Sequence, residues 1–184
     1  MSDKMYRLGL IVGRFQMLHA GHEDMIGRAI ALCDRVCVFV GSSQESGTRN
    51  NPFDYQTRHD MLYRVFGETI DIHPLPDKGI GNNGSWGEYL MSHTWDIYHA
   101  YPDLHITGKE SRHLDWFSGL KGVLIAELFI PKAVEISASE MRQHLLDNDE
   151  AAWKKMVNPA LYPMYEHLRR QIVASWENTN TQSI

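Results

Sequence analysis

The sequence predicts an α/β protein built on a Rossmann-like, doubly wound parallel sheet with a helical C-terminal segment. An apolar run over residues 6–13 is typical of a buried strand, and apolar residues at helical spacing follow over residues 22–34. A second apolar run, "RVCVFVG", covers residues 35–41. A strand, a helix and a strand within about 35 residues form a βαβ unit, and such crossovers build parallel sheets.

The rest of the chain continues this alternation and then becomes helical. The spacing predicts, in order, a helix over 54–66, a strand over 69–76, a helix over 86–101, and strands over 104–108 and 122–131. Helices are expected over 138–147, 150–157 and 160–176, with Pro163 breaking or starting one of them. Because no repeat or linker interrupts the pattern, residues 1–184 are predicted to form a single domain with a frayed tail over 177–184.

The composition is that of a globular protein with a sizeable core. The 184 residues carry a formal net charge of −5, which argues against a general nucleic-acid binder because phosphate-backbone affinity needs a basic face. No run approaches the roughly 20 apolar residues of a membrane span, and the N-terminus lacks the features of a signal peptide. We therefore expect a cytoplasmic protein without a membrane partner. The two cysteines, Cys33 and Cys37, are expected to be reduced core thiols, since their spacing fits neither a redox pair nor a zinc ribbon.

The stretch "GRFQMLHAGH", residues 13–22, follows the first predicted strand and places His19 and His22 three residues apart. Three interpretations are open: a metal site, a phosphate cradle, or two histidines that cap and pack a helix start. In an open α/β sheet, ligands bind beyond the carboxyl ends of strands, where a helix N-terminus favours an anion. Only Glu23 and Asp24 offer nearby carboxylates for a metal. The position therefore favours the phosphate cradle.

Residues 19–22 resemble the H-x-G-H signature of the nucleotidylyltransferase superfamily, and residues 13–16 resemble its flank in nicotinamide-mononucleotide adenylyltransferases. The stretch "EISASEMR", residues 135–142, resembles the second superfamily signature, which starts a helix so that hydroxyls and an arginine face a triphosphate. The loop over 41–58 is similar to that of the archaeal-type enzymes. "LPDKGIGNNGSW", residues 75–86, resembles their nicotinamide pocket. An indole can stack on a cationic pyridinium, and an amide side chain can pair with the carboxamide.

The resemblance implies transfer of adenylate from ATP to nicotinamide mononucleotide, which gives NAD and pyrophosphate. It assigns catalytic roles to His19, His22, Arg14 and Arg142. It implies that ATP and its phosphates are bound by Gly13, Phe15, Gln16, Gly21, Ser42, Arg58, Ser137 and Ser139. It implies that the nicotinamide nucleotide is bound by Asn82, Asn83 and Trp86. Mg²⁺ is implied as a substrate-bound cofactor without metal ligands from the protein, and related enzymes are commonly homo-oligomers.

The chain departs from the family pattern in a few places. Met17 stands where relatives commonly have proline, and Asn50 stands where they are often basic. No segment has the Nudix hydrolase spacing, so among the Nudix-fused bacterial enzymes the resemblance covers the synthetase half alone.

Alternative functions remain open. The acceptor could be nicotinate mononucleotide, phosphopantetheine or a polyol phosphate, although the last two have no pyridinium for Trp86 to stack on. A non-catalytic nucleotide sensor of the same fold is another possibility, and a histidine-rich metalloprotein is a third, but the remaining histidines are scattered along the chain.

Overall fold

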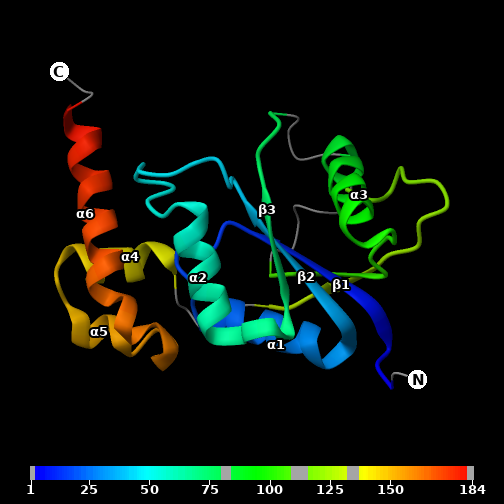
Figure 1. Cartoon of the computed structure of the whole chain (residues 1–184), viewed down its shortest axis with the longest axis horizontal. Coiled ribbons are helices and arrows are strands. Elements are labelled where there is room, and N and C mark those ends of the chain that lie inside the picture. Colours follow the sequence, from blue (N-terminus) through cyan, green and yellow to red (C-terminus); the bar gives the residue numbers. More distant parts are fainter. Residues whose placement is uncertain (1–2, 80–83, 109–115, 132–136, 182–184) are drawn as a thin grey trace.

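The computed structural model describes residues 3–79, 84–108, 116–131 and 137–181, which form a five-stranded, all-parallel sheet in the order β3-β2-β1-β4-β5 (Figure 1). The strands are β1 (Tyr6–Gly13), β2 (Cys33–Gly41), β3 (Asp71–Leu75), β4 (Leu104–Thr107) and β5 (Ala126–Phe129). The helices are α1 (Ala20–Leu32), α2 (Tyr55–Phe66), α3 (Gly84–Tyr98), α4 (Ala138–Leu146), α5 (Glu150–Lys154) and α6 (Tyr165–Thr181), with 3₁₀ turns η1 (Gly67–Thr69) and η2 (Pro159–Met164). The predicted α/β fold class is confirmed.

The central strands are buried on both faces, as their continuous apolar sequences require. In β1, Leu10 packs into a core with α3, whereas its neighbour Ile11 packs into a larger core with α1, α2 and the C-terminal helices. Both side chains are fully buried. Figure 1 shows α3 across the sheet from α1 and α2, so helices cover both faces.

The strand order reverses at β1, which lies between β2 and β4. The connection through α1 leads to one neighbour and the later crossover through α3 leads to the other. Such a reversal opens a crevice at the carboxyl ends of the strands, which is where ligands bind in open parallel sheets. The fold therefore predicts a ligand site at the turn after Gly13.

Several boundaries differ from those expected. Pro163 lies inside η2, and α6 begins only at Tyr165, because proline cannot donate an intrahelical bond. The strand expected over 122–131 is limited to β5, whose residues alternate between partly buried and exposed at the sheet edge. Helix α6 runs to Thr181, into the tail expected to fray, whereas the packed residues Ser175 and Trp176 lie just before that tail.

Cys33 and Cys37 are free and buried, as expected. Burial raises the pKa of the Cys33 thiol to about 11 and that of Cys37 to about 12, so both stay protonated at neutral pH. Cys33 is the C-cap of α1, where its N–H donates to the Ala29 carbonyl, and it is also the first residue of β2. Among the described residues, no helix has the length and apolar character needed to cross a bilayer.

We predict that Gly87→Ala destabilises the protein. A Cβ atom at Gly87 would collide with the backbone carbonyl of Trp116, so the alanine variant forces α3 and the segment of Trp116 apart. Overpacking of this kind costs up to about 3 kcal/mol of the free energy of unfolding, which urea denaturation measures. The matched control is Gly27→Ala in α1, where no atom lies within 4 Å; it should stabilise by roughly 0.5–1 kcal/mol. Equal stability of the two variants would contradict this packing.

Candidate active site

The two histidines of the H-x-G-H stretch lie together at the N-terminus of α1. His19 is the N-cap, and its Nδ1 accepts the backbone N–H of His22 at 3.4 Å. The imidazole rings stack with centroids 3.8 Å apart. A Cβ atom at Gly21 would lie 3.2 Å from His19 Nδ1. The absence of a side chain at Gly21 therefore leaves room for the His19 ring. The helix-start interpretation is thus correct locally, and it also leaves both rings beside a helix N-terminus that favours anions.

The Phe15 ring packs against this histidine pair. Its backbone has φ of +50°, and its ring is 1% exposed and lies 4.9 Å from the His22 ring. A Cβ atom at Gly13 would lie 2.9 Å from Cζ of that ring, so the glycine lets the strand end pack directly on it. Phe15 therefore shapes the turn with its side chain, and any contact with ATP is left to its backbone.

Gln16 and Met17 continue the turn into the interior. Gln16 is 4% exposed, and its amide exchanges two hydrogen bonds with the backbone of Phe53, at 3.0 and 3.1 Å. The side-chain amide is thus already paired with the protein, so any contact of Gln16 with ATP is left to its backbone. Met17 is fully buried in the larger core. The departure from proline at this position thus places an apolar side chain in the core.

Two arginines flank the turn. Arg14 is exposed, and its Nη1 lies 3.4 Å from Oδ1 of Asn51. Arg142 reaches from α4, where Nη1 donates to the Gln16 carbonyl at 3.1 Å and Nη2 to Ser139 Oγ at 3.2 Å. Burial and then the nearby charge of Arg14 lower the pKa of Arg142. Within the described part of the chain, neither guanidinium forms an ion pair with a carboxylate, so the pair is suited to a bound anion.

Arg58 requires a correction, because the resemblance implies a phosphate ligand and the structure shows a buried clamp. The side chain is fully buried. Nε donates to the Asp54 carbonyl at 3.1 Å. Nη1 and Nη2 donate to the backbone carbonyls of Arg14, Gly41, Ser42 and Glu45, at 3.0, 2.8, 3.0 and 3.5 Å respectively. A guanidinium has five N–H donors, and all are taken here by backbone, so none is left for a phosphate.

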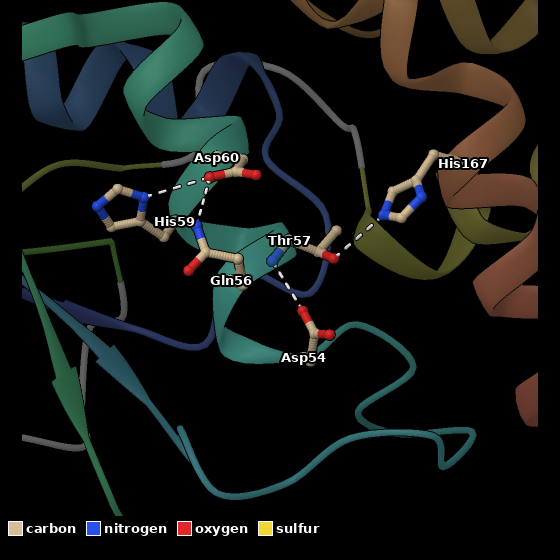
Figure 2. A network of polar contacts seen from close by, with 6 residues as sticks. All are labelled: Asp54, Gln56, Thr57, His59, Asp60 and His167. Carbon is tan, nitrogen blue, oxygen red and sulfur yellow. Dashed lines mark hydrogen bonds and ion pairs between the residues drawn. The ribbon is translucent and has the colours of Figure 1, made fainter.

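Polar contacts with α6 fix the first turn of α2, which carries Arg58 (Figure 2). The Asp54 side chain caps the helix by accepting the Thr57 N–H at 2.8 Å. The Thr57 hydroxyl lies 3.5 Å from Nε2 of His167. It also accepts a hydrogen bond from Nε2 of Gln171 at 2.9 Å. The C-terminal helix therefore helps to orient the clamp.

Two of the three predicted serines, Ser137 and Ser139, lie at the start of α4, and the third, Ser42, directly follows β2. Ser137 caps α4, and its Oγ accepts the Glu140 N–H at 3.1 Å. Ser139 is exposed beside Arg142. Ser42, at the end of β2, has φ of +48° and is held through its carbonyl by Arg58. Ser139 and the start of α4 thus face the same region as Arg142.

The predicted nicotinamide pocket is represented by Trp86 alone, because Asn82 and Asn83 lie outside the described residues. Trp86 is half-buried in the first turns of α3, with its ring 5.4 Å from Tyr89 and 6.1 Å from Trp116. It lies with the core across the sheet from α1. Sequence reasoning did not find Tyr89, whose hydroxyl donates to the Pro76 carbonyl at 2.9 Å.

The donor set of this site does not suit a directly bound metal ion. The described residues contain no group of three or more His, Cys, Asp or Glu side chains placed to hold one. His19 Nδ1 already accepts a backbone N–H, and the neighbouring groups are arginines and hydroxyls. The metal interpretation of the two histidines therefore gains no support from the structure.

Together these features define a nucleotide-binding α/β protein. They are the reversal of strand order at β1, the helix N-terminus, the stacked histidines and the two arginines. The chain belongs to the cytidylyltransferase-like family, whose model matches residues 10–144. It is 29% identical over 170 residues to nicotinamide-nucleotide adenylyltransferase of Thermococcus kodakarensis, covering 83% of this chain and 79% of the relative. It is 37% identical over 92 residues to the enzyme of that name from Saccharolobus solfataricus, covering 47% of this chain and 52% of the relative.

The fold is also that of a larger solved protein. A bifunctional NMN adenylyltransferase/ADP ribose pyrophosphatase from Francisella tularensis superposes with a TM-score of 0.75 at 19% identity. The match covers 92% of this chain and 53% of the solved one, so the chain spans about half the length of that protein.

We predict that Arg58→Lys lowers the free energy of unfolding by about 2–5 kcal/mol, because lysine has three donors and leaves buried carbonyls unpaired. Urea denaturation measures the change, with Arg28→Lys as control. Arg28 forms an exposed ion pair with Asp24 within α1, so its substitution should cost less than about 1 kcal/mol. Wild-type stability combined with weakened ATP binding in Arg58→Lys would contradict the clamp and restore the phosphate-binding role.

Proposed function

We propose that this protein transfers adenylate from ATP to nicotinamide mononucleotide, giving NAD and pyrophosphate. The observation that carries the proposal is the cationic cradle: Arg14 belongs to the turn that precedes α1, Arg142 donates to the Gln16 carbonyl of the same turn, and neither has a carboxylate partner among the described residues. The archaeal relatives named for this reaction support it across most of the chain. Two free, buried cysteines fit a reducing compartment, and we include a cytoplasmic location in the proposal.

The chemistry asks the protein for positioning and for charge stabilisation. The acceptor phosphate is already an anion at neutral pH, so no general base is required. Its oxygen attacks the α-phosphorus of ATP, and the bond from that phosphorus to the bridging oxygen breaks as pyrophosphate leaves. Charge then builds on the departing phosphates. We assign the stabilisation of that charge to hydrogen bonds from Arg14, Arg142 and the His22 imidazole.

The remaining predicted residues support this arrangement. Ser137 and Ser139 lie at the start of α4, where hydroxyls and backbone N–H groups can bind phosphate oxygens. Trp86 is proposed to stack on the pyridinium of the acceptor. The described residues hold no cluster suited to Mg²⁺, so the ion is proposed to arrive on the triphosphate of ATP, with phosphates and water as its ligands.

The test is incubation of the protein with ATP, MgCl₂ and one candidate acceptor at a time, with pyrophosphate release and the adenylylated product measured. We expect rapid NAD formation from nicotinamide mononucleotide. Comparison with nicotinate mononucleotide, phosphopantetheine and a polyol phosphate defines the acceptor. Nucleotide binding without pyrophosphate release from any mixture would overturn the proposal in favour of a nucleotide sensor.

We predict that His22→Ala lowers turnover by 10²- to 10³-fold or more, the usual effect of removing one preorganised donor to a developing charge. Steady-state kinetics with saturating substrates measure turnover, and thermal denaturation checks folding. His99→Ala is the matched control, because His99 is exposed near the C-terminal end of α3, away from the site. Near-normal turnover in a folded His22→Ala protein would remove His22 from catalysis.

We predict that Trp86→Ala raises the Michaelis constant for nicotinamide mononucleotide by roughly 5- to 30-fold and changes that for ATP little. The expected size is that of a lost stacking and cation–π contact of about 1–2 kcal/mol. Initial rates with each substrate varied in turn measure both constants, and Trp95→Ala, on an exposed turn of α3, is the control. Equal increases for both substrates would count against stacking.

A further inference from the structure

Hydrogen bonds join the loop after β2 to the loop after β3, beyond the point where the two strands end. Strand pairing reaches Gly41 and Leu75, and the Ser43 N–H then donates to the Leu75 carbonyl at 3.2 Å. One residue further, the Gln44 side chain contacts Asp77 twice. Its Oε1 accepts the Asp77 N–H at 3.0 Å, and its Nε2 lies 3.4 Å from Asp77 Oδ2. One amide thus holds both the main chain and the side chain of Asp77.

The loop after β2 is fixed on the side of the proposed ATP site. The Ser42 carbonyl accepts from Arg58 Nη2 and from the Glu45 N–H, both at 3.0 Å. Arg58 also holds the Arg14 carbonyl. Gln44 therefore extends from backbone whose position is set together with that of Arg14.

The loop after β3 is fixed on the side of the proposed acceptor site. The Pro76 carbonyl accepts the hydroxyl of Tyr89, and the Tyr89 ring lies 5.4 Å from the Trp86 ring. Lys78 Nζ lies 5.7 Å from the centroid of the same tyrosine. Residues 76–78 are thus held between Gln44 from one loop and Tyr89 from α3.

We propose that Gln44 and Tyr89 are positioning residues that set the distance between the acceptor pocket and the ATP site; the inference rests on the proposed function. The pocket residue Trp86 lies on α3, across the sheet from the histidines of α1. Contacts between the loops at the end of the sheet are therefore needed to align the acceptor pocket with the ATP site. In-line transfer is sensitive to such alignment, since a misplacement of about 1 Å can cost 10²-fold in rate.

The first test measures Michaelis constants for both substrates in Gln44→Ala and Tyr89→Phe. Each variant loses hydrogen bonds to residues 76–77 and should raise the constant for nicotinamide mononucleotide by about 3- to 10-fold, with that for ATP nearly unchanged. The matched control is Gln56→Ala. Gln56 makes the same type of bond, to Asp60 at 2.7 Å, but within the exposed face of α2 (Figure 2). Both constants should be unchanged in the control.

The second test measures whether a second substitution restores the Michaelis constant for the acceptor. A merely structural role would not give such a recovery selectively for one substrate. Gln44→Glu places two carboxylates together and should raise the acceptor constant at least as much as Gln44→Ala. Adding Asp77→Asn restores an amide and carboxylate pair in the opposite sense and should return the constant toward the wild-type value. Thermal denaturation confirms folding of each variant, and Gln44 and Asp77 are both exposed, so no core is disturbed.

The outcomes separate this inference from the proposed function. If the wild-type protein forms no NAD, the proposed function fails. If the wild type forms NAD but Gln44→Ala leaves the acceptor constant unchanged, raises both constants equally, or shows no rescue in the double variant, the positioning role is overturned while the function stands.

Discussion

The candidate site depends on one buried guanidinium. Parallel strands end with their carbonyl groups directed into the same crevice, and buried carbonyls without donors would destabilise the loops that follow. Arg58 supplies the donors for the ends of β1 and β2, for the loop beyond β2 and for the start of α2. Its planar fork satisfies these groups from a single centre, which a lysine could not do. The turn of Arg14 and the strained backbone of Ser42 are therefore fixed together.

A second set of bonds brings the C-terminal helices into the site. Gln16 pairs with Phe53 through its side chain and with Arg142 through its carbonyl. Asn158, the N-cap of η2, donates to Glu23 in the first turn of α1 at 2.8 Å. The helices after the sheet thus bring Arg142 to this turn as well as covering a core. This explains why residues of two motifs separated by more than a hundred positions lie close together, since both are anchored to the turn after β1.

Sequence patterns predicted some features well because their physical causes are local. β1 was predicted to its exact ends, since a continuous apolar run between polar flanks admits few alternatives, and the histidine at the start of α1 is indeed its cap. The roles of Arg58 and Gln16 could not be predicted from the sequence, because a residue type does not tell whether its donors bind a ligand or the backbone. Gln44, Asp77 and Tyr89 carried no signal either, since their contacts form only once two crossovers are folded.

The arginines of the candidate site divide into two groups, and this division explains how a chain with a net charge of −5 can carry a local positive patch. Arg58 is neutralised locally by carbonyl dipoles and has no donor left for a ligand. Arg14 and Arg142 have fewer partners: Arg142 donates to the Gln16 carbonyl and to Ser139, Arg14 lies near the Asn51 side chain, and neither forms an ion pair with a carboxylate among the described residues. An anion bound beside them would relieve their mutual repulsion, whereas distant surface carboxylates are screened beyond roughly 10 Å by salt. The site is therefore charged locally by the fold, independently of the overall charge of the chain.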